Sequence, residues 1–234
     1  MTQSGPESTK KSLLVGESET RGATPATHYS PEFLETNKDY YLSIEDYDWV
    51  DATDQVRGLE AFFHKLRARE VRQLVAKHAI KERMLDAGCG TALNLRDLPA
   101  GSIGVDINPR NLPRARRYAP RATVLQGDLE GLPFPDETFS TVLCTEVLEH
   151  FPEPGFPLNE LKRVLRSGGR FIGSVPADSW IWHLRFLSST CPHGEPYHKN
   201  YERREIEALL QGLRVLSIHK GCFGMSWFFV AEKP

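Results

Sequence analysis

The chain has 234 residues, a length that suits one α/β domain with additions or two small domains. Hydrophobic residues make up 40% and charged residues 26%, and the formal net charge of −2 gives no overall basic field for binding nucleic acid. Four cysteines without a C-x-x-C pair, and no apolar run near the ~20 residues of a membrane span, favour a cytoplasmic protein with reduced thiols over a zinc ribbon, disulfide scaffold or transmembrane protein.

The N-terminal third divides into two segments. Residues 1–30 are rich in Ser, Thr, Gly, Glu and Pro, so we expect a disordered tail that cannot bury enough apolar surface to offset its ordering entropy. Residues 31–78 begin with clustered aromatic side chains and continue with an apolar pattern of helical spacing over 59–78. We therefore predict an N-terminal helical cap over 31–78.

From residue 79 the pattern alternates between short apolar strands and helices. The predicted strands are 83–88, 102–107, 122–128, 139–146 and 170–176, and the helices between them are 92–98, 109–119 and 157–169. Strands that alternate with helices predict a Rossmann-like α/β fold, in which helices cover both faces of a mostly parallel sheet. We predict a single domain over 79–234.

Residues 177–200 interrupt this rhythm with Trp, His and Pro residues just after a strand, where open α/β sheets place their ligands. We predict that this insert is a lid. Within it, 179–187 is amphipathic enough to touch a membrane surface peripherally. A helix over 203–211 and two closing strands, 213–220 and 226–233, complete the predicted elements.

The stretch "MLDAGCGTA" (84–92) leads from a buried strand into a glycine-rich turn. Gly88 and Gly90 let the backbone fold sharply and let a ligand approach it closely, although Leu93 stands where a dinucleotide fingerprint has its third glycine. Asp106 ends the next predicted strand and Asp128 the one after. The carboxyl ends of parallel strands meet at one edge, so these acidic residues are predicted to converge there.

These segments resemble the class I S-adenosylmethionine-dependent methyltransferases. The resemblance is carried by "MLDAGCGTA", "GVDINP", "LQGDLEGLPFPDETFSTVLCTEVLEHF" and "LNELKRVLRSGGRFIGSVP", and covers about residues 80–176. It departs from the family at Ala92, where another glycine is frequent, and at Ser140, where an aspartate is usual. The resemblance implies a seven-stranded sheet whose last strand is antiparallel, and S-adenosyl-L-methionine as cofactor.

The resemblance also implies roles for individual residues. Those expected to bind the cofactor's methionine part are Gly88, Cys89 and Gly90, with Asp86, Thr145 and Glu146 flanking that end. Asp106, followed by Ile107, is expected at the ribose, and Asp128 with Leu129 at the adenine. His150 and His198 are the candidate catalytic bases, because an acceptor hydroxyl or amine can need one. This set contains no metal ligand.

Three functions remain open from the sequence. The first is methyl transfer to a small molecule, at a hydroxyl oxygen. The second is metal-assisted 2′-O-methylation of RNA 3′ ends, because Glu146, Glu149, His150 and His198 resemble the E-x-x-E-H and later His of such enzymes. The third is a non-catalytic binding protein with the same fold, which the intact glycines and aspartates argue against. The acceptor's identity and the oligomeric state are not encoded in a motif.

Overall fold

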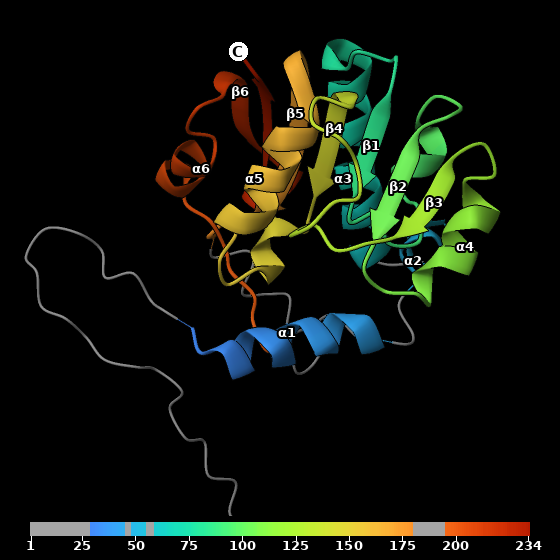
Figure 1. Ribbon diagram of the computed structural model, residues 1–234, viewed down its shortest axis with the longest axis vertical. Helices are drawn as coiled ribbons and strands as arrows, with labels where there is room; N and C mark the ends of the chain where they lie inside the picture. The colour runs from blue at the N-terminus through green and yellow to red at the C-terminus, as the bar shows by residue number, and fades with distance from the viewer. Residues whose placement is uncertain (1–28, 45–47, 55–58, 180–194) are drawn as a thin grey trace, which may run out of the picture.

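A seven-stranded sheet forms the centre of the protein (Figure 1). The computed structural model describes residues 29–44, 48–54, 59–179 and 195–234. The strands are β1 (Met84–Ala87), β2 (Ile103–Asp106), β3 (Thr123–Gln126), β4 (Phe139–Thr145), β5 (Leu165–Pro176), β6 (Arg214–Gly221) and β7 (Ser226–Glu232). Their order is β3-β2-β1-β4-β5-β7-β6, and β7 pairs antiparallel with both β5 and β6. The predicted Rossmann-like sheet with an antiparallel last strand is confirmed.

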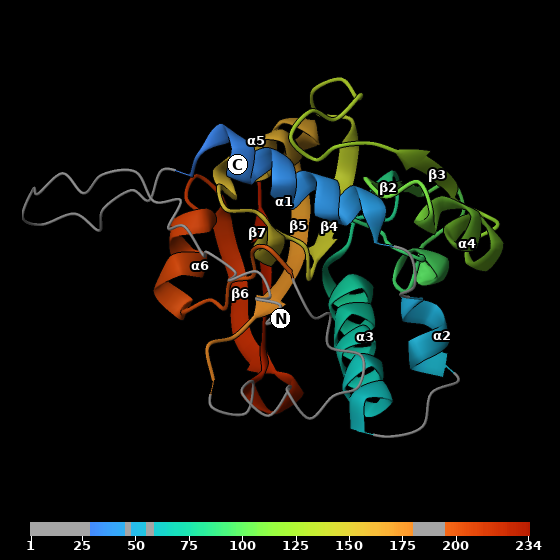
Figure 2. The ribbon, with the colours of Figure 1, turned by 90° about the horizontal axis from the view of Figure 1, so that it is seen from below.

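Helices cover both faces of this sheet (Figures 1 and 2). They are α1 (Pro31–Ser43), α2 (Trp49–Asp54), α3 (Leu59–His78), α4 (Asn111–Tyr118), α5 (Gly155–Val164) and α6 (Arg203–Leu209), with 3-10 turns η1 (Leu95–Asp97), η2 (Leu148–His150) and η4 (Cys222–Gly224). Among the helices within the described ranges, none is long and apolar enough to cross a membrane. Residues 1–28 of the predicted disordered tail 1–30, residues 180–194 of the predicted lid 177–200 and most of the predicted membrane-touching stretch 179–187 lie outside the described residues.

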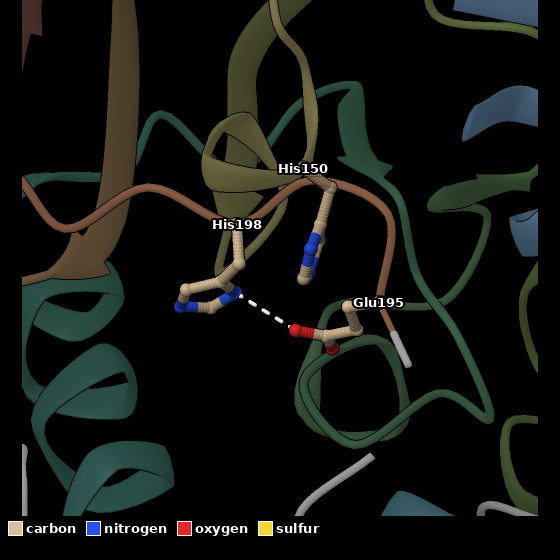
Figure 3. Close-up of side chains that lie close together, drawn as sticks. All are labelled: His150, Glu195 and His198. Carbon is tan, nitrogen blue, oxygen red and sulfur yellow. Dashed lines mark ion pairs between the residues drawn. The ribbon is translucent and has the colours of Figure 1, made fainter. Parts of the chain in front are cut away.

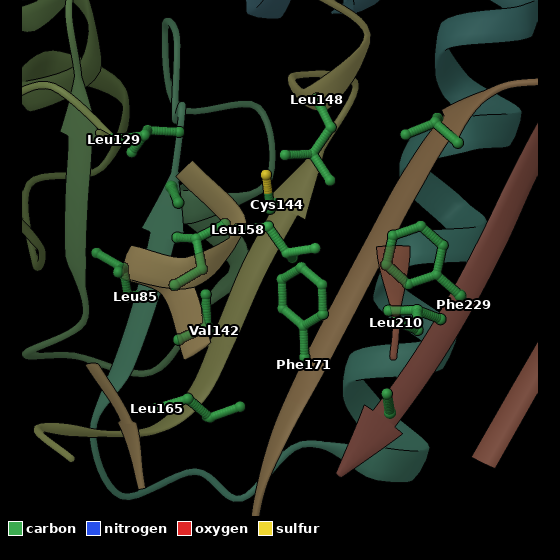
Figure 4. Packing of buried hydrophobic residues seen from close by; sticks show 14 of the residues in the cluster. Leu85, Leu129, Val142, Cys144, Leu148, Leu158, Leu165, Phe171, Leu210 and Phe229 are labelled. Atoms are coloured by element: carbon green, nitrogen blue, oxygen red, sulfur yellow. The ribbon is translucent and has the colours of Figure 1, made fainter. Parts of the chain in front are cut away.

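Two hydrophobic layers sandwich the sheet because successive strand residues point to opposite faces. In β4, Val142 and Cys144 join the layer that includes residues of α5 and α6, whereas Leu143 joins the layer that includes residues of α3 and α4. Figure 4 shows the first layer, where the rings of Phe171 (β5) and Phe229 (β7) lie 5.7 Å apart between centroids. Burial on both faces explains why β4 is continuously apolar over Val142, Leu143 and Cys144.

Two predicted helices differ from the observed elements. The β1–β2 connection forms only the 3-10 turn η1 instead of a helix over 92–98. Helix α5 ends at Val164 instead of at residue 169, because Leu165 is extended and already pairs with Phe139. Gly168 instead donates its N–H to the carbonyl of Lys233 and so ties the start of β5 to the chain end beyond β7.

Helix α1 lies across the carboxyl ends of the parallel strands (Figures 1 and 2). The Asn37 amide donates to the carbonyl of His150, 2.9 Å away, just after β4. The Asn108 amide donates to the carbonyl of Ile44, 2.8 Å away, just after β2. Helix α3 packs differently, because Val71 and Leu74 share a hydrophobic layer with strand residues. The predicted domain boundaries, including the one at residue 79, stay predictions.

Candidate functional site

A tight glycine turn follows β1. Gly88 and Gly90 have φ values of +73° and +50°, in the left-handed region that favours glycine. The N–H groups of Gly88 and Cys89 both donate to the carbonyl of Val105, which fixes the turn to β2. A Cβ on Gly88 would lie 2.4 Å from Val147, and one on Gly90 would lie 3.2 Å from Trp49 of α2. Besides allowing the turn, Gly88 therefore permits close packing against the segment after β4, and Gly90 permits close packing against α2 of the cap.

Cys89 and Leu129, both predicted to bind the cofactor, have buried side chains, so mainly their backbone groups are available to a ligand. The side chains of Cys89 and Leu129 are buried within opposite hydrophobic layers. Burial, with lesser contributions from Asp86 and Asp106, raises the pKa of the Cys89 thiol well above its usual range. A neutral, buried thiol behaves as a small apolar group rather than as a nucleophile.

Asp106, at the end of β2, is a buried carboxylate that organises the turn. It accepts hydrogen bonds from the N–H of Gly90 at 2.7 Å, the N–H of Asn108 at 3.0 Å and the amide of Asn111 at 3.0 Å. Burial raises the pKa of Asp106, and these three bonds oppose the rise. A carboxylate has about four acceptor positions, so some capacity remains for a ligand. Ile107 follows it and is half-buried.

Asp86, in β1, is a buried carboxylate with one oxygen that has no hydrogen-bond partner among the described residues. Its Oδ2 accepts no hydrogen bond from the described residues, and the side chain is 2% exposed. Burial, and secondly the nearby Asp106, raises the pKa of Asp86 to about 7. An uncompensated buried carboxylate is costly, so this oxygen marks a position suited to a cationic or hydrogen-bonding ligand.

Asp128, just after β3, contacts the cap. Its carboxylate forms an ion pair with Lys38 of α1 and also accepts the N–H of Glu130 at 3.0 Å. The hydrogen bond that Lys38 donates to Asp128 raises the pKa of Lys38, against the opposing effect of burial. Asp128, which the resemblance predicts to bind the adenine, is thus paired with Lys38 of α1 in this structure.

Thr145 and Glu146 end β4 on the other side of the turn. The Thr145 hydroxyl accepts the Asn94 amide at 2.9 Å. Glu146 has φ +54°, pairs with Arg67 of α3, and accepts the Ser174 hydroxyl at 2.8 Å. Backbone strain of this kind costs about 1–3 kcal/mol and persists where surrounding contacts hold it. Glu146 is fixed between the sheet and α3.

The two predicted catalytic histidines lie close together (Figure 3), with ring centroids 5.4 Å apart. His150, in η2, lies with its Nδ1 2.8 Å from the Tyr41 hydroxyl of α1. The Nδ1 of His198 lies 3.2 Å from a carboxylate oxygen of Glu195. Glu149 is buried, and burial followed by the charge of Glu146 raises its pKa well above its usual range.

The comparisons with known proteins come from sequence and from structure. Residues 85–173 match the family model described as a methyltransferase domain. That span starts in β1 and ends in β5, so it contains the glycine turn and all three aspartates. The order of the strands and this match both fit the fold predicted from the sequence. Over residues 85–173 the chain is therefore similar to a methyltransferase domain.

Individual relatives of this methyltransferase domain cover different parts of the chain. The sterol 24-C-methyltransferase erg6 of Aspergillus fumigatus is 30% identical over 65% of this chain and 44% of its own length. The fatty-acid O-methyltransferase of Mycolicibacterium smegmatis is 37% identical over 39% of this chain and 36% of its own length. The chain thus spans less than half the length of these relatives.

A solved structure supports the fold over a longer span. Magnesium protoporphyrin IX methyltransferase of Synechocystis, solved with bound S-adenosylhomocysteine, superposes with a TM-score of 0.67 at 20% identity. The superposition covers 86% of this chain and 99% of that one. At this identity the likeness concerns the fold alone.

Sequence reasoning missed the cap residues that reach the site. These are Lys38, Tyr41 and Trp49, together with Arg67 of α3 and Glu195 beside His198. The aromatic cluster after residue 31 was the only sequence signal, and it pointed to a cap without indicating which strand ends it covers. The ligand-binding roles of the predicted residues stay predictions.

Proposed function

We propose that the protein is an S-adenosylmethionine-dependent methyltransferase that transfers a methyl group to a hydroxyl oxygen of a small-molecule acceptor. The observation that carries this proposal is the buried Asp86 oxygen without a hydrogen-bond donor, beside a glycine turn fixed by Asp106. The methyltransferase domain match over 85–173 supports the same assignment.

The residues present fit the cofactor. The free carboxylate oxygen of Asp86 suits the cationic amine of an amino-acid group, and the remaining acceptor capacity of Asp106 suits a ribose hydroxyl. Asp128 suits an exocyclic amine once Lys38 has moved away from it. When bound, the cofactor supplies an electrophilic methyl group. The chain's own task is therefore to orient the two reactants and exclude water.

The acceptor is proposed to bind beneath α1, next to His150 and His198. The Tyr41–His150 hydrogen bond ties α1 to the end of β4, and His150 or His198 could take the acceptor's proton. A small molecule fits a net charge of −2 better than RNA does. The named relatives act on a sterol carbon and on a fatty acid, so apolar acceptors belong in the first test panel.

The metal-assisted RNA function receives less support. It requires Glu146 and Glu149 as ligands together with the histidines, but Glu146 pairs with Arg67 and Ser174. Glu149 lies 3.9 Å from Nε2 of His150 and is buried at 2% exposure. The non-catalytic alternative predicts no cofactor binding, or binding without turnover.

The test is calorimetry with S-adenosylhomocysteine, followed by transfer of a labelled methyl group to hydroxyl-bearing acceptors. Asp106→Ala should weaken cofactor binding by more than about tenfold, about 1.4 kcal/mol. The control is Asp136→Ala, which removes a carboxylate whose side chain is 76% exposed. Equal affinity in both variants, or no binding by the parent protein, would contradict the proposal.

A further inference from the structure

A cluster of two imidazoles and one carboxylate lies under helix α1. His150 comes from η2, whereas Glu195 and His198 come from the segment that precedes α6 (Figure 3). One ligand-type atom from each of these three residues lies within 4.8 Å of the others. Among the described residues, no other group of three meets this condition. Two segments far apart in sequence therefore bring together a set of groups typical of metal sites.

We propose that His150, Glu195 and His198 bind one first-row divalent transition-metal cation, with Zn²⁺ as the reference case. Imidazole nitrogens suit zinc, iron, nickel and copper, whereas magnesium and calcium prefer oxygen ligands. Two histidines and a carboxylate leave at least one coordination position for an external ligand, as in catalytic zinc sites. The ligand set differs from the one that the alternative RNA-methylating function takes from the sequence, because Glu195 replaces Glu146 and Glu149.

The distances are compatible with a small contraction on binding. Bonds of about 2.0–2.1 Å in a tetrahedron place ligand atoms roughly 3.3 Å apart. The Nδ1 of His198 and the carboxylate of Glu195 are already 3.2 Å apart. The most separated pair, at up to 4.8 Å, needs to close by about 1.5 Å. Half-buried side chains, with exposures of 22%, 12% and 18%, combine access for the ion with partial exclusion of water.

Tyr41 supplies the support that metal-binding histidines usually have. Its hydroxyl lies 2.8 Å from Nδ1 of His150 and so fixes the orientation of that ring. The same hydroxyl lies 3.2 Å from the carbonyl of Tyr197, which adjoins His198. Outer hydrogen bonds of this kind typically contribute 10–100-fold to metal affinity. One residue of α1 thus contacts both segments that carry the ligands.

The role of the ion rests on the proposed methyl transfer. A cation at this position would bind the acceptor's hydroxyl oxygen and stabilise its ionised form, while the hydroxyl proton passes to a solvent water. His150 and His198 would then be ligands rather than bases. The two roles differ experimentally, because a base works after chelator treatment, whereas a metal-dependent reaction stops and returns when the metal is restored.

The test is a titration of the full-length, chelator-treated protein with Co²⁺, followed by visible absorption, and then displacement by Zn²⁺. We expect one equivalent to bind, and expect His198→Gln and Glu195→Gln each to weaken binding by more than about 100-fold. Tyr41→Phe should weaken it by about tenfold. The matched control is His219→Gln on β6, a histidine paired with Glu70, which should leave binding within about twofold.

Absence of one-equivalent binding, or equal affinity in the ligand and control variants, would overturn the proposal. Thermal melts of each variant show whether it folds, and the isosteric Glu195→Gln serves as the decisive variant if His198→Gln unfolds. Binding of S-adenosylhomocysteine is measured on the same samples. A parent protein that binds the cofactor but no metal rejects the metal site alone, whereas a parent protein that binds metal but no cofactor rejects the proposed function.

Discussion

Replacing Asp86 by Asn should flatten the dependence of stability on pH. The folded pKa of Asp86 is about 7 against an ordinary value of 3.8, a difference of about three units that burial causes. A raised carboxyl pKa means that the folded state binds the proton more tightly than the unfolded state. Stability is therefore lost as pH rises from the unfolded pKa to the folded pKa. At 1.36 kcal/mol per unit the full loss is about 4 kcal/mol, of which about 2 falls between pH 5 and pH 7.

The assay is urea denaturation of the cofactor-free protein at pH 5, 6 and 7. Asp86→Asn should lose about 2 kcal/mol less than the parent over this range, because its amide cannot ionise. Asp136→Asn, an exposed carboxylate, should follow the parent. Parallel curves for the parent and Asp86→Asn would refute the assignment of a costly ionised Asp86. The parent's affinity for S-adenosylhomocysteine should also rise with pH towards 8, because the ligand's amine favours the ionised carboxylate.

Three further changes test the packing around the site. Gly88→Ala should lower the free energy of unfolding by about 2–5 kcal/mol in urea denaturation, because φ is +73° and the added Cβ would clash with Val147. Adding Val147→Ala should recover part of this loss, and no recovery would contradict the steric explanation. Lys38→Gln should tighten S-adenosylhomocysteine binding up to about fivefold in calorimetry by releasing its carboxylate partner after β3, whereas weaker binding would show that Lys38 supports the ligand. Arg67→Met should lower the free energy of unfolding by about 2 kcal/mol in a denaturant titration, because Glu146, which is 16% exposed, loses its cation. The control is Arg72→Met, which removes an exposed ion pair. Equal losses in the two variants would deny the Arg67–Glu146 pair a special role in stability.

The strands of the sheet were predictable because each one is indicated by a short run of consecutive residues. Val142, Leu143 and Cys144 are continuously apolar, and such runs between turn residues indicate a strand buried on both faces. The glycine turn and the three aspartates followed from their positions at successive strand ends. Helix α6 also appeared where expected, and Glu202 and Glu205 form a capping box at its start.

The side-chain partners around the site were not predictable from sequence. Glu195 meets His150 only because the chain after β5 returns across the end of β4, and no local pattern encodes that return. The end of α5 was misjudged for a similar reason. Leu165 leaves the helix to pair with Phe139, and a tertiary contact of this kind overrides local helix preference.

Helix α1 joins the strand ends at separate points, through Lys38 to Asp128, Asn37 to the backbone of His150, and Ile44 to Asn108. If the cofactor binds beneath α1, as proposed, a molecule as large as a nucleoside that enters there would break some of these attachments. Their rupture would then act as a gate with its own rate constant, separate from that of methyl transfer. If the gate is slower, turnover would depend on solvent viscosity and on the strength of α1's anchors, while varying little between acceptors of different reactivity.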